Sequence, residues 1–227
     1  MHSAHKFLDL GKKYLDMFGI LNFELFLIAT LVFIITPGMD TIFVLNKSIS
    51  QGRSAGIYSA IGVNAGILVH TMFAALGLSV LIAQSALAFS IVKYLGAAYL
   101  IYLGIKSILS KEKSFNLAQI SSETESGWKN FKSGLITNVL NPKVALFFLS
   151  FFPQFVQKEA VGSSIPFIVL GFTYAILGLI YYCILALSMN LFSAKIKKNN
   201  KIKGFMDKFS GMVFILMGIK VAFSKLK

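Results

Sequence analysis

Residues 25–45 read LFLIATLVFIITPGMDTIFVL, an apolar run that contains one ionisable side chain, Asp40, and one proline, Pro37. The run is long enough to cross a bilayer, whose hydrocarbon core is about 30 Å thick. A helix that starts at Leu25 reaches Pro37 after about 18 Å, which is past the middle of that core. Broken backbone at this depth is tolerated only where protein or a wet cavity satisfies the freed amide and carbonyl groups. The stretch therefore predicts a membrane protein with an internal polar cavity used for transport.

The composition of the 227-residue chain is that of an integral membrane protein. Hydrophobic residues make up 56% of it and charged residues 14%, and the mean hydropathy is +0.74. This is too apolar for one soluble core. We expect an all-α membrane protein with six transmembrane helices, at Leu25–Leu45, Ile57–Ala83, Leu87–Leu109, Leu135–Phe152, Ile165–Leu187 and Phe209–Phe223.

Short internal repeats divide these helices into two sets of three. The sequence LGIK at 103–106 matches MGIK at 217–220, and KYLG at 93–96 matches KFSG at 208–211, one residue out of step. Setting Pro37 on Pro142 pairs the first helix with the fourth, and we expect both to be broken at the proline. Because an odd number of crossings reverses the second unit, the repeats would be inverted and the two breaks would meet near the midplane.

The chain then divides into four parts. Residues 1–24 predict an interfacial amphipathic segment rather than a cleaved signal peptide. Residues 25–109 form the first three-helix repeat and residues 131–227 the second. Residues 110–130, with several Ser and Glu, form the polar linker between them.

The net charge of +13 is distributed unevenly among the loops. Lysine and arginine gather after the first, third and fifth helices, which places those loops in the cytoplasm and both termini outside. The basic run Lys195–Lys203 is a topology signal beside anionic lipid. We expect no nucleic-acid partner, because no aromatic or groove-reading module accompanies the run.

Asp40 is the sharpest candidate for a substrate or ion site, together with Thr36, Pro37 and Gly38 beside it. A carboxylate in hydrocarbon should face the bundle interior, pair with a cation or hold a proton. Proton and substrate ammonium could therefore compete for it. The alternative is a structural aspartate that caps the helix restarting after Gly38.

The fourth helix carries the counterpart of this motif in Asn138, Asn141, Pro142 and Lys143. The proline frees carbonyl groups one turn back, and the asparagines can satisfy them. Lys143 offers a cation for a substrate carboxylate or for Asp40. The alternative is that Lys143 extends to the membrane interface from a short helix.

Small residues recur at helical spacing in the second and fifth helices. Such stripes allow close packing of backbones, and they comprise Gly52, Gly56, Ser59, Gly62, Gly66 and Gly77 with His70 in the second helix, and Gly171 and Gly178 with Tyr174 and Tyr182 in the fifth. We expect the two tyrosines to turn their hydroxyls to a cavity or a partner. His70 could relay protons, or it could be a neutral histidine bonded to a neighbouring helix.

The sequence lacks the residues that several classes of function require. The single cysteine, Cys183, excludes a disulfide framework, a CxxC redox pair and a thiolate metal cluster. Motifs for a zinc protease, a serine hydrolase and a phosphate-binding loop are absent from the sequence. We expect no enzyme activity, no cofactor and no metal, and transport driven by an ion gradient or by a partner subunit.

The order of motifs resembles the lysine exporter and homoserine/threonine resistance (LysE/RhtB) family of bacterial amino-acid exporters. Besides the first-helix motif, the resemblance includes SxxxGRxxG at 48–56, the glycines at 62–66, KYLGAAYL at 93–100 and NxxNPK at 138–143. Met39 stands where family members usually have a second proline. The Ser48–Gly56 pattern resembles the threonine/homoserine branch more than the lysine branch.

The resemblance implies a multi-pass protein of the bacterial inner membrane that exports amino acids or related small zwitterions in exchange for protons. Its partners would be the amino-acid substrate, protons and the lipid bilayer, and a homo-oligomer stays open. The alternative in another class is a membrane scaffold or assembly factor that uses its glycine stripes to bind partners.

Overall fold

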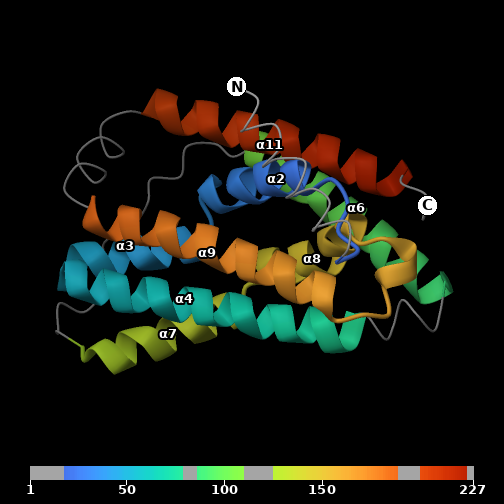
Figure 1. The fold of residues 1–227 in the computed structure, drawn as a ribbon. Helices are drawn as coiled ribbons and strands as arrows, with labels where there is room; N and C mark the ends of the chain where they lie inside the picture. The colour runs from blue at the N-terminus through green and yellow to red at the C-terminus, as the bar shows by residue number, and fades with distance from the viewer. Residues whose placement is uncertain (1–17, 79–85, 110–124, 189–199, 224–227) are drawn as a thin grey trace, which may run out of the picture.

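The computed structural model describes residues 18–78, 86–109, 125–188 and 200–223 (Figure 1). Regular structure in these ranges is helical apart from one isolated β-bridge, which confirms the all-α class. The helices are α2 (Phe23–Ile35), α3 (Met39–Gln51), α4 (Arg53–Phe73), the π-helical turn η1 (Ala74–Leu78), α6 (Ala86–Ile108), α7 (Gly127–Val139), α8 (Pro142–Phe151), the short 3₁₀ helices η2 (Phe152–Phe155) and η3 (Lys158–Ala160), α9 (Ile165–Leu187) and α11 (Asn200–Phe223).

The two predicted helix breaks are present. α2 and α3 are bent by 51° at Thr36–Gly38, and α7 and α8 are bent by 51° at Leu140 and Asn141. Pro37 has no backbone N–H to continue α2 and disfavours the helical conformation for Thr36, whose ψ is 117°. Pro142 instead occupies the first turn of α8, and the Asn141 side chain caps that helix by accepting from the Lys143 N–H at 3.0 Å.

Length and apolar composition allow two helices of the described part to cross a membrane alone, Arg53–Gly77 and Ile165–Leu187. Counting each bent pair as one broken span raises the number to four. α6 and α11 lie at the predicted third and sixth helices but fall outside this count. Three predicted starts were clearly too late, since α4 begins at Arg53, α7 at Gly127 and α11 at Asn200.

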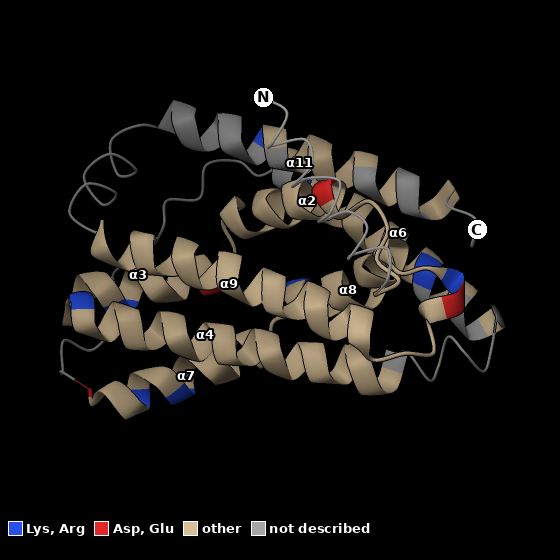
Figure 2. Cartoon of the chain, viewed as in Figure 1, with Lys and Arg blue, Asp and Glu red and all other residues tan. Residues whose placement is uncertain are grey.

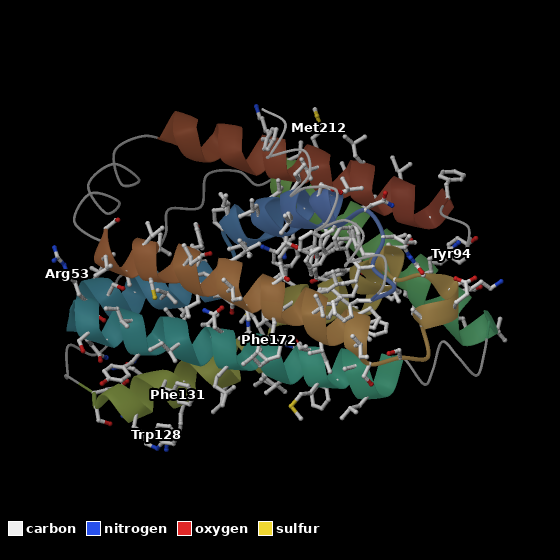
Figure 3. All side chains as sticks on the ribbon, in the orientation of Figure 1. Arg53, Tyr94, Trp128, Phe131, Phe172 and Met212 are labelled. Atoms are coloured by element: carbon white, nitrogen blue, oxygen red, sulfur yellow. The ribbon has the colours of Figure 1, made fainter. Side chains whose placement is uncertain are left out.

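Charged residues lie mostly near the ends of the bundle (Figure 2). Large apolar side chains such as Tyr94, Phe172 and Met212 are exposed on its flanks (Figure 3). An exposed apolar flank with charged ends suits a protein surrounded by lipid. The molecule is therefore a multi-pass membrane protein.

An aromatic cluster fills the core between α2, α8, α9 and α11. The Phe33 ring lies 4.0 Å from Phe147 and 5.8 Å from Phe214, centroid to centroid. Phe147 lies 5.7 Å from Tyr174 of α9. Such rings bury a large apolar area and hold the end of α2 at a fixed place beside α8.

The glycine face of α4 packs against α7, as the stripe predicted. A Cβ on Gly62 would collide with the carbonyl of Phe131, and a Cβ on Gly134 would lie 2.5 Å from the carbonyl oxygen of Ser59. A Cβ on Gly66 would lie 2.5 Å from Asn138 Oδ1. These glycines let two backbones approach closely, and Gly66 leaves room for a polar side chain beside the break in the α7–α8 pair.

Helices α6 and α11 also meet through glycines. A Cβ on Gly104 would lie 2.6 Å from the carbonyl oxygen of Gly211, and a Cβ on Gly218 would lie 2.8 Å from that of Ala97. Because the later residue of one helix meets the earlier residue of the other, α6 and α11 run antiparallel.

A shift of 114 residues relates the two contacts. It takes Gly104 to Gly218, and it takes Ala97, the partner of Gly218, to Gly211, the partner of Gly104. The LGIK and MGIK repeats therefore make equivalent contacts. The structure explains why the KYLG and KFSG match is one residue out of step with the LGIK and MGIK match. Ala97, and not Gly96, is the residue that corresponds to Gly211 in the contacts, and Gly96 packs against α8 instead.

Two predicted segments lie largely outside the described residues. For the N-terminal segment only 18–24 are described, and residues 18–22 form a turn and a bridge before α2 starts. For the linker only 125–130 are described. Position 126 is the N-cap of α7, and positions 127–130 form its first turn. The amphipathic helix and the solvated linker stay predictions.

Candidate functional site

Lys143 reaches from α8 to the broken end of α2. Its Nζ donates to the carbonyl oxygens of Phe33 at 3.1 Å and Thr36 at 3.0 Å. The Phe33 carbonyl is free because Pro37, four residues on, has no N–H to donate to it. The cation also complements the negative end of the α2 dipole and lies 4.4 Å from the centroid of the Phe33 ring. The ammonium group thus lies inside the bundle at the break and does not extend to a membrane interface.

Asp40 lies in the first turn of α3, on the other side of the same break, and is 4% exposed. Its Oδ2 accepts from Asn138 Nδ2 at 2.8 Å. Its Oδ1 meets the geometric criteria for a hydrogen bond with no residue in the described part of the chain, although the Asn141 side chain also lies beside the carboxylate. The residue at the N-cap of α3 is Gly38, so Asp40 is not the cap. A buried carboxylate oxygen without a donor is available to bind a ligand.

His70 of α4 binds the backbone of the second break. Its Nε2 lies 3.1 Å from the carbonyl oxygen of Asn138. A carbonyl only accepts, so this hydrogen bond places a proton on Nε2. The ring also stacks on Phe148 at 5.6 Å between centroids. His70 therefore supports Asn138, which in turn supports Asp40, and it does not line the cavity described next.

A small cavity lies between the two breaks. It holds about 10 Å³ for the centre of a water-sized sphere, which is room for about one water molecule. An amino acid does not fit, so binding one requires helices or side chains to move. The lining residues are Phe33, Thr36, Gly38, Asp40, Thr41, Asn141, Lys143, Val144, Tyr174 and Tyr182.

The structure brings most of the predicted site residues together. Thr36, Gly38, Asp40, Asn141 and Lys143 line the cavity. Pro37 and Pro142 shape the two breaks, Asn138 binds Asp40, and His70 is one contact further away.

Three lining residues had no separate signal in the sequence. Phe33 precedes the first motif, and Thr41 and Val144 each follow a motif residue by one position. Their apolar or hydroxyl character is ordinary for a transmembrane helix, so only the arrangement of the helices reveals them. Tyr174 and Tyr182 of α9 line the cavity as predicted.

Comparison with known proteins identifies the family. The model for the LysE type translocator matches residues 31–225, which include both breaks and the whole cavity lining. The chain belongs to the LysE family. This is a family of membrane transporters, and the LysE chain described here is accordingly a membrane translocator.

Curated relatives cover nearly the whole LysE chain. The membrane protein YrhP of Bacillus subtilis, named as uncharacterized, is 33% identical over 199 residues, which are 84% of this chain and 93% of that protein. The leucine efflux protein of Salmonella typhimurium is 32% identical over 205 residues, which are 90% and 96%. The leucine efflux protein of Klebsiella pneumoniae is 31% identical over the same length and shares. No solved structure matches the chain.

Proposed function

We propose that this LysE chain exports amino acids with uncharged side chains across the cytoplasmic membrane. The observation that carries the proposal is the pair of opposite charges, Asp40 and Lys143, that lines one cavity at two helix breaks. A substrate ammonium group suits the free Asp40 Oδ1, and a substrate carboxylate suits the Lys143 ammonium. To bind Lys143, the carboxylate has to compete with the carbonyls of Phe33 and Thr36.

The charges of the cavity favour a neutral side chain. Among its lining residues, Asp40 is the only carboxylate and Lys143 the only ammonium, and a zwitterionic backbone uses both. A cationic or acidic side chain would enter without a partner, which is costly in a low dielectric. Phe33, Val144 and Tyr174 offer apolar surface instead. The leucine efflux relatives, 31 to 32% identical, agree with this class.

Export from preloaded cells tests this class directly. Cells that overexpress the chain should release leucine at least about tenfold faster than lysine or glutamate, the ratio expected when a charged side chain lacks its buried partner. Cells with the empty vector give the background. Equal release of lysine and leucine would contradict the charge argument, and release of no amino acid would contradict the function.

Proton antiport is the proposed energy source. Asp40 can hold either a proton or a substrate ammonium group, but not both. Alternate binding of the two would couple export to proton entry. The direct support is the position of Asp40, which is buried, lines the cavity and keeps one oxygen unpaired in the described part.

The architecture that serves this cycle is proposed to be two inverted repeats of three helices. Equal bends of 51° in the α2–α3 and α7–α8 pairs support it. The antiparallel α6 and α11, with contacts related by a shift of 114 residues, support it independently. In this scheme α6 and α11 are the third and sixth membrane helices.

The scaffold alternative gains no support from the described helices. The glycines of α4 that the alternative would use are occupied within the chain, where Gly62 and Gly66 pack against α7. Because Gly62 and Gly66 already contact α7, this face of α4 is not available for contacts between copies of the chain.

We propose that both termini lie outside the cytoplasm, as the charge bias predicts. Single cysteines at Ser122, in the linker, and at Ser163, between α8 and α9, test this in a Cys183→Ala background. A membrane-impermeant thiol reagent added to intact spheroplasts should label position 163 and spare position 122. Labelling of 122 alone would reverse the orientation, and labelling of both would contradict a single crossing between them.

A further inference from the structure

One end of the bundle is closed by a polar contact between α3 and the start of α7. Lys47 Nζ donates to Glu125 Oε2 in an ion pair. Gln51 Oε1 accepts from the Glu125 backbone N–H at 3.2 Å and from Asn130 Nδ2 at 3.2 Å. These four side chains, Lys47, Gln51, Glu125 and Asn130, are called the polar closure.

The polar closure is more buried than an ordinary surface ion pair. The side chains of Lys47 and Glu125 are 9% and 16% exposed, whereas Lys129, which also contacts Glu125 at 3.0 Å, is 64% exposed. The hydrogen bond from Lys47, followed by that from Lys129, lowers the pKa of Glu125 to about 2. Glu125 is therefore ionised at any cellular pH, and its own titration does not open the contact.

The opposite end is closed by backbone pairing instead. Ile20 forms an antiparallel β-bridge with Val156. The N–H of Leu21 donates to the carbonyl of Phe155 at 2.8 Å, and the N–H of Gln157 donates to the carbonyl of Gly19 at 2.8 Å. We call residues 19–21 and 155–157 the backbone closure.

The two closures occupy equivalent places in the proposed repeat. The shift that sets Pro37 on Pro142 takes Gln51 of the polar closure to Val156 of the backbone closure, and it takes Ile20 of the backbone closure to Glu125 of the polar closure. Each closure thus joins the last residues of the second half of one broken helix, or the residues just after it, to the residues at or just before the start of the other broken helix. Chance contacts would have no reason to repeat this relation at both ends.

The geometry points to a pair of gates, and this inference rests on the proposed transport function. We propose that the polar closure is the gate at the face where α3 ends, and that the backbone closure is the gate at the opposite face. Both contacts are formed in this structure, and the cavity between the breaks has room for about one water molecule. Because α3 carries Asp40 and α7 carries Asn138, parting Lys47 from Glu125 would move the two helices that meet at the site.

A cysteine in the cavity measures the gate without any substrate. Val144→Cys in the Cys183→Ala background places a small thiol in the cavity lining and replaces an apolar residue, so that the polar lining residues stay unchanged. A membrane-impermeant maleimide is applied to inside-out and to right-side-out vesicles. Lys47→Gln or Glu125→Gln should speed labelling about tenfold from the face where α3 ends, and from that face only, because each variant removes a charge-assisted hydrogen bond.

Two controls separate gating from loosened packing. Lys129→Gln removes an exposed partner of the same carboxylate and should change labelling by less than about twofold. The exchanged pair K47E/E125K, made together with Lys129→Gln so that no second ammonium lies beside position 125, restores opposite charges and should return labelling toward the slow rate. Unchanged labelling in both single variants, faster labelling from both faces, or no recovery in the exchanged pair would overturn the gate.

The labelling result is separate from the export result. If labelling changes as expected but no amino acid is exported, the gate holds and the proposed function fails. If export is normal and labelling does not change in the single variants, the function holds and the gate fails.

Discussion

Replacing Asp40 with asparagine is expected to reduce proton-driven amino-acid export below about a tenth of the wild-type rate. The amide can still accept the hydrogen bond that Asn138 gives to Oδ2 at 2.8 Å, so the fold should persist. It loses the charge that binds ammonium or a proton, and a hydrogen bond to a charged group contributes about 1.5–3 kcal/mol. Export from preloaded proteoliposomes with and without a pH gradient measures the effect.

Asp40→Glu is the matched variant for this change, because it keeps the charge and moves it by one methylene. It should retain more coupled export than Asp40→Asn if charge is the requirement. A residual exchange in the Asn variant that ignores the pH gradient would support the proposed coupling. Wild-type export driven by protons in the Asn variant would exclude Asp40 as the coupling group.

Lys143→Gln is expected to lower export by at least about tenfold, whereas Lys143→Arg should keep part of the activity. The ammonium holds two carbonyls at the end of α2, those of Phe33 and Thr36, and offers the cation proposed for the substrate carboxylate. Arginine keeps the charge and the donors, although its planar guanidinium is larger than the ammonium it replaces. Glutamine keeps a donor without the charge, and each lost charged hydrogen bond contributes about 1.5–3 kcal/mol. Initial rates of leucine efflux compare the two variants.

Lys132→Gln provides a control on α7, where the residue is exposed, its ammonium lies 5.8 Å from the Trp128 ring, and it does not line the cavity. It should leave export unchanged. Equal loss in both Lys143 variants would assign the residue to packing at the break rather than to charge. Wild-type export in both would remove Lys143 from the site.

The sequence by itself determined the helical class, the two breaks and most residues around them. A proline lacks its N–H wherever it stands, so Pro37 and Pro142 interrupt a helix for a local reason that needs no partner. Glycines at helical spacing likewise predict a close packing face, and Gly62 and Gly66 make that contact. The starts of α4, α7 and α11 were misplaced, because a polar first turn such as Gly127–Asn130 looks like a loop in the sequence until a neighbouring helix packs on it.

The tertiary structure alone decided which side chains meet. Lys143 could have extended to the interface, and its bond to the Phe33 carbonyl, 110 residues away, fixes it at the end of α2. Asp40 meets Asn138 across 98 residues, and Lys47 meets Glu125 across 78. A linear pattern reports which face of a helix is polar, but not which helix faces it. That choice depends on how the glycine and aromatic surfaces of α4, α7 and α8 fit together. Packing fixes the positions of the helices, and these positions determine which charged side chains come within reach of each other.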